Sequence, residues 1–154
     1  MALLCEGSSA AKGRIIVDAD ACPRPVLEIA GRLARKRGWD IITVASFNHS
    51  IRSKCHVTVD DGPEAVDLRI LNMCGAGDVV ISQDWGLAAM VLAKGAYCLS
   101  PSGREYRHEN MDAMLEIREA MAKHRRGGGK TKGPKKRSPA DDARFEGALD
   151  ALLK

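Results

Sequence analysis

Short apolar runs alternate with longer stretches of helical periodicity along this chain of 154 residues. The runs have the length of buried strands. They occupy residues 14–18, 40–45, 56–59, 78–82 and 96–99. Because strands that alternate with helices form parallel βαβ units, the pattern predicts an α/β fold built on a mostly parallel, five-stranded sheet.

Proline and glycine mark the ends of the predicted helices. The first helix begins near residues 23–25, because proline is tolerated in a first turn, and it ends at Gly38 after several cations. The second opens in "GPEAVDLRI" and stops near "CGAG", and the third runs from Asp84 to Gly95. The turn signal in "LSPSGREY" predicts a hairpin at the edge of the sheet.

Two more helices are predicted in the last third of the chain. Asn110 can cap a helix that runs to about His124. The final helix has Ser138 as its cap, Pro139 in its first turn and Asp141 at the spacing of a capping box. Its apolar face holds Phe145, Leu149 and Leu152.

The length and the hydrophobic content of 45% allow one core, so we expect a single compact domain. Its parts are a flexible N-terminus (1–13), an α/β domain (14–124), a glycine-rich basic linker (125–137) and a C-terminal helix (138–154) that packs on the same domain. No apolar run approaches the roughly 20 residues of a membrane helix. The first residues also lack the features of a signal peptide, so we expect a cytoplasmic protein without a membrane partner.

The charge is distributed unevenly. Residues 123–137, the basic segment, hold eight Lys and Arg and no acid. Because the whole chain carries +4, the remaining residues carry −4. A solvated linker would explain the segment, but a nucleic-acid partner, with RNA favoured, would also use its cations. The candidate nucleic-acid-binding residues are Arg125, Arg126, Lys130, Lys132, Lys135, Lys136 and Arg137.

Aspartates follow two of the predicted strands. Asp18 and Asp20 end the first strand, and Asp84 comes just after the fourth. In open α/β sheets, ligands bind outside the carboxyl ends of the strands at the point where the strand order reverses, so these acids converge if the two strands are neighbours. Asp67 shares a helical face with apolar Ile70 and can point toward the same place. Each acid also has a structural explanation, such as a helix cap at Asp84.

Hard oxygen ligands of this kind suit Mg²⁺ or Mn²⁺. Such ions can activate a water for phosphodiester hydrolysis without a histidine base, and the four histidines, scattered along the chain, are expected at the surface. The five cysteines form no Cys-x-x-Cys pair, so free thiols are expected rather than a zinc site or a disulfide framework. The candidate metal ligands are Asp18, Asp20, Asp67 and Asp84, and the candidate catalytic residues are Asp18, Asp20 and Asp84.

Several motifs together resemble the YaiI/YqxD family of uncharacterised bacterial proteins. These are "VDADACP", "GDVVISQDWGLAAMVLAKGA", "LSPSGREYRHEN" and the closing "ALDALL", and the resemblance covers about residues 14–153. That family is similar to PIN-like nuclease domains, which implies a three-layer α/β/α sandwich and a metal-dependent ribonuclease. The resemblance matches Asp18 to the leading acid and Asp20 to its neighbour. It matches Asp67 to the helix acid and Asp84 to the acid after the fourth strand. Trp85, Gly86 and the missing acid near "CLSPSG" depart from the PIN pattern.

Two other functions stay open at this point. One is a non-catalytic RNA- or protein-binding module, for which the basic segment would suffice. The other is a phosphatase of the haloacid dehalogenase type, which also places Asp-x-Asp after a strand. It is less favoured, because Cys22 stands where that class has threonine or valine, and because Gly77 and Asp78 precede their strand instead of following it.

Overall fold

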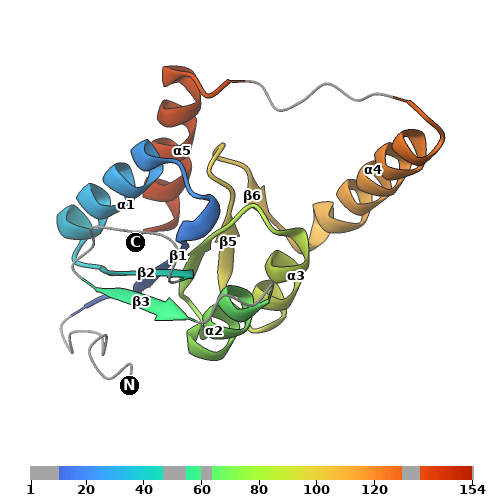
Figure 1. Cartoon of the computed structure of the whole chain (residues 1–154). Helices are drawn as coiled ribbons and strands as arrows, with labels where there is room; N and C mark the ends of the chain where they lie inside the picture. The colour runs from blue at the N-terminus through green and yellow to red at the C-terminus, as the bar shows by residue number, and fades with distance from the viewer. Residues whose placement is uncertain (1–10, 47–54, 60–63, 130–135, 154) are drawn as a thin grey trace.

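The computed structural model describes residues 11–46, 55–59, 64–129 and 136–153. A six-stranded sheet in the order β3-β2-β1-β4-β5-β6 forms its centre (Figure 1). The strands are β1 (Arg14–Asp18), β2 (Asp40–Ser46), β3 (His56–Val59), β4 (Val79–Ile81), β5 (Tyr97–Leu99) and β6 (Glu105–Tyr106). The first five strands pair in parallel, and β6 pairs antiparallel with β5. The predicted mostly parallel sheet and its edge hairpin are therefore confirmed.

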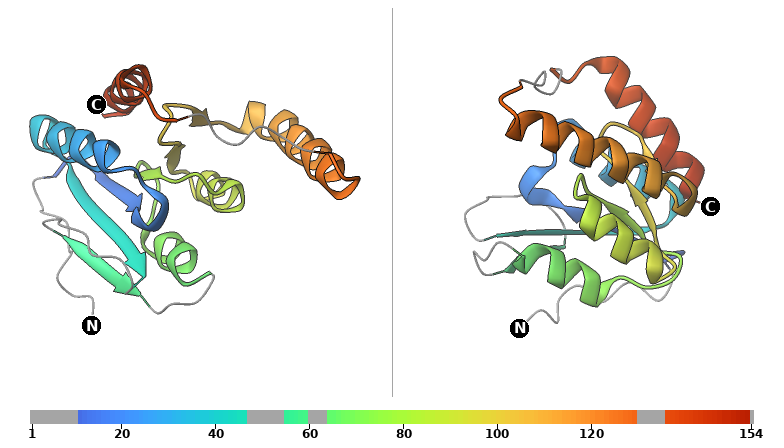
Figure 2. Two further views of the ribbon diagram at one scale, coloured as in Figure 1. Left: turned by 45° about the horizontal axis from the view of Figure 1, so that its top comes forward. Right: turned by 90° about the vertical axis from the view of Figure 1, so that its right-hand side faces the viewer.

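Helices cover both faces of the sheet. The described helices are the short 3-10 helix η2 (Ala19–Ala21), α1 (Arg24–Arg37), α2 (Ala65–Met73), α3 (Trp85–Ala93), α4 (His108–Arg126) and α5 (Pro139–Leu152), of which α1, α2, α3 and α5 cover the sheet (Figure 2). Figure 2 shows α1 and α5 on one side of the sheet and α2 and α3 on the other. This arrangement is the three-layer α/β/α sandwich expected for a PIN-like domain.

The alternation of side chains along β1 divides the core in two. Ile15 and Val17 pack with α1 and α5, whereas Ile16 packs with the helices on the opposite face. All three side chains are fully buried. Because a parallel strand in the middle of a sheet is covered on both faces, its central positions are apolar in succession instead of alternating with polar ones.

The helix ends follow the predicted signals with one exception. Gly38 adopts the left-handed conformation with φ of 75° after α1, and Ser138 forms the predicted capping box with Asp141. The prediction for Asn110 is wrong by one turn, because α4 begins three residues earlier. Arg107 is the N-cap, and its backbone N–H donates to the Asn110 side chain at 3.0 Å. Asn110 therefore closes the capping interaction from inside the helix.

The cysteines largely follow expectation. Cys22, Cys74 and Cys98 are free thiols, but Cys55 is disulfide-bonded, so the expectation of a free thiol is wrong there. Among the described helices, none combines the length and the hydrophobicity that a membrane span requires.

The C-terminal helix should contribute strongly to stability. Phe145 of α5 is fully buried in the core shared with α1. Phe145→Ala should lower the free energy of unfolding by about 3–5 kcal/mol, because it removes an aromatic ring and leaves a cavity. Denaturant titration checks this, with Leu68→Ala as the control, because the Leu68 side chain on α2 is 56% exposed. Equal effects of the two substitutions would mean that α5 is not part of the cooperative fold.

Candidate functional site

The sheet order places two strand ends side by side. The first strand, β1, lies between β2 and β4. The chain therefore continues from β1 to β2 on one side of the sheet centre, and from β4 to β5 on the other side. Asp18 is the last residue of β1, and Asp84 follows β4 after Ser82 and Gln83. The strand order reverses at this point, which is the usual position of a ligand site in open α/β sheets. The predicted adjacency of the first and fourth strands is therefore present.

Ser82 links the two strand ends. Its hydroxyl donates to Asp18 Oδ2 at 2.9 Å, and it accepts the backbone N–H of Asp84 at 3.0 Å. The Ser82 residue is only 2% exposed, so its hydroxyl is satisfied inside the protein. Ser82 is not among the candidate residues predicted from the sequence, although its position directly after a buried strand is a usable signal.

Asp84 is both a helix cap and a member of the acidic group. Its Oδ1 accepts the backbone N–H of Leu87 at 3.0 Å, as an N-cap residue does at the start of a helix. A Cβ at Gly86 would lie 3.3 Å from this oxygen, so glycine gives the carboxylate room at a position where the PIN pattern differs. The neighbouring Trp85 packs edge-on against Tyr106 with ring centroids 5.1 Å apart.

Asp67 reaches the same place from α2. Burial raises the pKa of its carboxyl to about 6, with further contributions from the charges of Asp84 and Asp18 and from a hydrogen bond to Asp84. A hydrogen bond between two carboxyls needs a proton, so the protonated form of Asp67 donates to Asp84. Three acids from β1, α2 and the end of β4 thus interact with one another.

Asp18 and Asp20 have different surroundings. Burial raises the pKa of Asp18, the Ser82 hydroxyl opposes the shift, and the charges of Asp20 and Asp84 add to it. Asp20, in η2, accepts the backbone N–H of Ser46 at 2.9 Å and the Ser46 hydroxyl at 3.3 Å. It therefore ties η2 to the end of β2, a connection that the sequence did not indicate.

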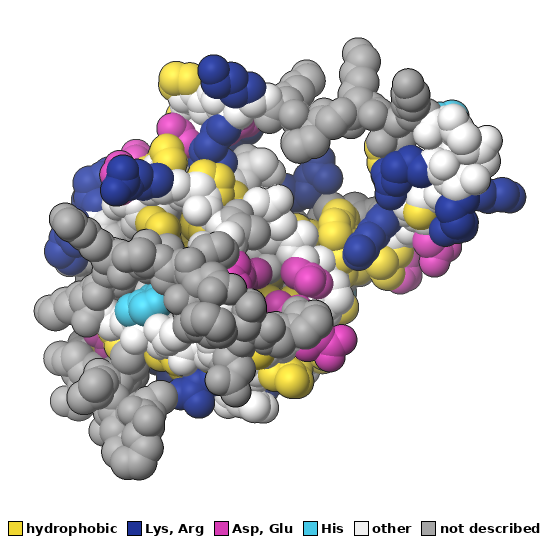
Figure 3. Space-filling model, viewed as in Figure 1, with side chains coloured by type: hydrophobic (Ala, Val, Ile, Leu, Met, Phe, Trp, Pro, Cys, Tyr) yellow, Lys and Arg dark blue, Asp and Glu magenta, His cyan; other side chains and the backbone are white. Residues whose placement is uncertain are grey.

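Figure 3 shows acidic side chains near the middle of the face it draws, with Lys and Arg mainly toward the periphery. Within the described parts of the chain, no three His, Cys, Asp or Glu side chains are gathered closely enough to form a ready metal cage. Burial raises the pKa of Cys22 in "DADACP" to about 12, so its thiol is neutral and a weak nucleophile.

His56 lies closer to the acids than expected. It is partly buried, its Nδ1 lies 2.6 Å from Thr43 Oγ1, and its buried Nε2 has no hydrogen-bond partner. Burial lowers its pKa, and the charge of Asp20 opposes that shift. The expectation of a surface histidine is wrong here, because the parallel register of β2 and β3 sets His56 beside Thr43. His108 and His124 are exposed, as expected.

The cations of the basic segment have varied surroundings. Arg125 and Arg126 lie in the last turn of α4 instead of in a linker, where the helix dipole favours cations. Lys136 is exposed. Arg137 is held in place, since it donates to Asp142 at 2.6 Å and to the Pro101 carbonyl at 2.7 Å. The candidates Lys130, Lys132 and Lys135 lie outside the described residues.

The geometry disfavours the phosphatase. Its second acidic motif would require Asp78 at the site, but Asp78 precedes β4, at the opposite end of the strand. There it pairs with Arg14 at 2.8 Å and accepts the backbone N–H of Gly75 at 2.9 Å. Asp78 therefore stabilises the amino edge of the sheet.

Comparisons with known proteins place this chain among bacterial sequences. A family model described as "Uncharacterized BCR, YaiI/YqxD family" matches residues 16–154. A "UPF0178 protein" of Heliobacterium modesticaldum is 50% identical over 141 residues, which cover 92% of this chain and 97% of the relative. A "UPF0178 protein" of Clostridium kluyveri is 43% identical, and the match covers 91% of this chain and 92% of the relative. A relative from Listeria innocua, also called "UPF0178 protein", is 41% identical, and the match covers 92% of this chain and 97% of the relative. No solved structure matches.

The raised pKa of Asp67 predicts a pH-dependent stability. The folded protein binds this proton more tightly than the unfolded chain, whose pKa is 3.8. The resulting stabilisation is complete below that value and is lost as the pH rises through about 6. Between pH 4 and pH 7, the unfolding free energy of the wild type should therefore fall relative to that of Asp67→Asn. Urea titrations with a chelator measure this, with Asp112→Asn on exposed α4 as the control. A constant difference between wild type and Asp67→Asn would contradict the shared proton.

Proposed function

The chain belongs to the YaiI/YqxD family, and from this premise we propose that its acidic site binds Mg²⁺ or Mn²⁺ and hydrolyses phosphodiester bonds in RNA. The observation that carries the proposal is the meeting of Asp18, Asp67 and Asp84 at the reversal of strand order. Acids brought together in this way repel one another unless a proton or a cation lies between them.

The donor set fits a hard divalent cation. Mg²⁺ keeps several waters and is usually bound through one or two carboxylates together with substrate phosphates. The absence of a three-ligand cage among the described side chains is therefore compatible with a hydrated ion. Asp18 and Asp84 would hold the ion, with Asp20 and Asp67 beside them. When bound, such an ion supplies an activated water and stabilises the charge that develops on the phosphate.

The surrounding residues have defined tasks in this proposal. Ser82 orients Asp18, and the backbone N–H of Leu87 orients Asp84, so both carboxylates are fixed before a ligand arrives. Without a bound cation, the pKa of Asp67 is raised to about 6, so this carboxyl can exchange a proton near neutral pH. It is thus suited to accept a proton from an attacking water or to return one to the leaving oxygen.

The distribution of charge supports RNA as the substrate class. An acidic site alone repels a polyanion, so a nuclease needs cations nearby that neutralise phosphates. Arg125, Arg126 and Lys136 are exposed at the two described ends of the basic segment. Their positions suit contacts with the sugar-phosphate backbone, which carry affinity without sequence specificity.

A non-catalytic nucleic-acid-binding module is the second candidate. The observation that favours it is the structural engagement of the acids, since Asp84 caps α3 and Asp20 binds Ser46. In that case the basic segment would carry binding and the acids would only stabilise the fold. Metal-dependent cleavage separates the two candidates.

Asp18→Asn should abolish Mn²⁺-dependent cleavage of single-stranded RNA and the rise in Tm that Mn²⁺ produces. The substitution removes a charge on the ion and little packing, so folding should persist. Cleavage assays and thermal unfolding with and without Mn²⁺ measure both effects, and Asp112→Asn on α4 should behave as wild type. Equal cleavage by Asp18→Asn would point to a contaminating nuclease. RNA binding without any cleavage by the wild type would support the binding module.

Replacing Arg125, Arg126 and Lys136 together with serine should weaken RNA binding and reduce its salt dependence. Each phosphate contact on a single strand contributes a slope of about −0.7 in the logarithm of affinity against the logarithm of salt concentration. RNA affinity at several salt concentrations measures both changes. Arg24, Arg32 and Arg35 on α1, replaced with serine, give a control of equal charge. Equal RNA affinities and equal salt slopes for the wild type and the basic-segment variant would contradict the proposed contacts.

A further inference from the structure

Helix α4 makes few contacts with the rest of the protein. It has 19 residues, and Met111 near its start is only 7% exposed. Beyond that anchor, three large apolar side chains face solvent: Leu115 is 39%, Ile117 60% and Met121 45% exposed. Figures 1 and 2 show α4 extending away from the sheet and from the other helices.

Such a helix needs a partner surface. In proteins, most of the stability of a helix comes from packing of its apolar face, not from its intrinsic propensity. Ala113, Ile117 and Ala120 recur at four- and three-residue spacing, so they share a face, with Met121 at its margin. That face is exposed along its length.

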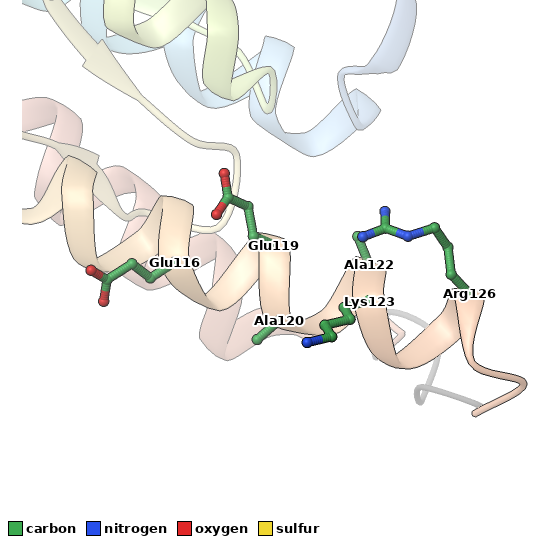
Figure 4. A pocket seen from close by; sticks show the side chains of 6 residues that line it. All are labelled: Glu116, Glu119, Ala120, Ala122, Lys123 and Arg126. Carbon is green, nitrogen blue, oxygen red and sulfur yellow. The ribbon is translucent and has the colours of Figure 1, made fainter.

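The charges of α4 are segregated along its axis. Acids occupy its first part, at Glu109, Asp112, Glu116 and Glu119, and three of the four Lys and Arg residues follow them, at Lys123, Arg125 and Arg126. Figure 4 shows this change of sign along a hollow lined by Glu116, Glu119, Ala120, Ala122, Lys123 and Arg126. Acids thus precede cations along one side of the helix.

We propose that α4 pairs antiparallel with the α4 of a second copy of this chain. An antiparallel pair sets the acidic part of each helix against the basic part of the other. A parallel pair would place acids against acids and cations against cations. One surface serves both subunits, as a two-fold symmetric dimer requires.

A specific contact follows from the helical spacing. Glu116 and Lys123 lie seven residues apart, on one flank of the face formed by Ala113, Ile117 and Ala120. Flanking charges of this kind select orientation in paired helices. In an antiparallel pair the same flanks of the two helices meet, so Glu116 of each copy faces Lys123 of the other.

The balance of charge favours a second copy over nucleic acid as the occupant of this face. The helix holds equal numbers of acidic residues and of Lys and Arg, and Arg125 and Arg126, the proposed RNA contacts, lie in its last turn, beyond this face. The face itself therefore does not attract a polyanion. Its own antiparallel copy matches both of its charged parts at once. The proposal is independent of the acidic site and of any activity there.

Sedimentation equilibrium of the full chain over a range of concentrations tests the dimer. The wild type should show a reversible monomer–dimer equilibrium, and Ile117→Ser should weaken it at least tenfold. The matched control is Leu68→Ser on α2, since Leu68 is exposed to a similar extent, 56%, and it should leave the equilibrium unchanged. A wild type that stays monomeric at every concentration, or equal behaviour of the two variants, would overturn the proposal.

Charge reversal tests the antiparallel orientation. Glu116→Lys or Lys123→Glu turns two symmetric attractions into repulsions and should weaken the dimer about tenfold. The double variant should restore it, because the reversed charges match again. A mixture of the two single variants should form a heterodimer, because one chain then offers only positive and the other only negative charge at these positions. The proposal would be overturned if the double variant did not restore the dimer and the mixture formed no heterodimer. It would also be overturned if the wild type were monomeric and Lys123→Glu lowered its RNA affinity instead.

Discussion

The pairing of β1 with β2 on one side and β4 on the other is the constraint on which the rest of the structure depends. It buries Ile15, Ile16 and Val17 completely and divides the core between the two helical layers. It also sends the chain away from the centre of the sheet in two directions, which leaves the carboxyl ends of β1 and β4 next to each other. The acids that follow those strands then meet as a consequence of the topology, whatever their sequence separation.

This meeting of acids has an electrostatic cost, and the surrounding residues reduce it. The Ser82 hydroxyl favours the charged form of Asp18, and the backbone N–H of Leu87 in the first turn of α3 donates to Asp84. Asp67 instead takes up a proton more readily, as its raised pKa indicates. A fold that needed these positions only for stability could place neutral side chains there. Several acids in partly buried positions lower the stability of the fold, and such a departure from the most stable choice of residues is expected at a functional site.

The sequence allowed the strands, most helix ends and the meeting of Asp18, Asp67 and Asp84 to be predicted, because these follow from local periodicity and from one topological rule. It did not allow the partners of these acids to be predicted. Ser46 at the end of β2 binds Asp20 of η2. The register of β2 and β3 sets His56 beside Thr43, where the charge of Asp20 acts on its ring. Such contacts depend on how distant segments align in space, which periodicity does not encode. Arg137 is a similar case, since its two partners come from α5 and from the turn between β5 and β6.

The position of Arg137 also connects the basic segment to the acidic site. The turn that contains Pro101 continues from the carboxyl end of β5, the same edge of the sheet at which the acids lie. The charge of Arg137 acts on Cys22, and so does the charge of Asp18, so both are near that thiol. One end of the basic segment is therefore fixed close to the acids, while its other end begins on α4. The proposed function depends on this placement. Cations among the acids would neutralise them, and distant cations would not hold a polyanion beside them, whereas cations attached next to the acids avoid both outcomes.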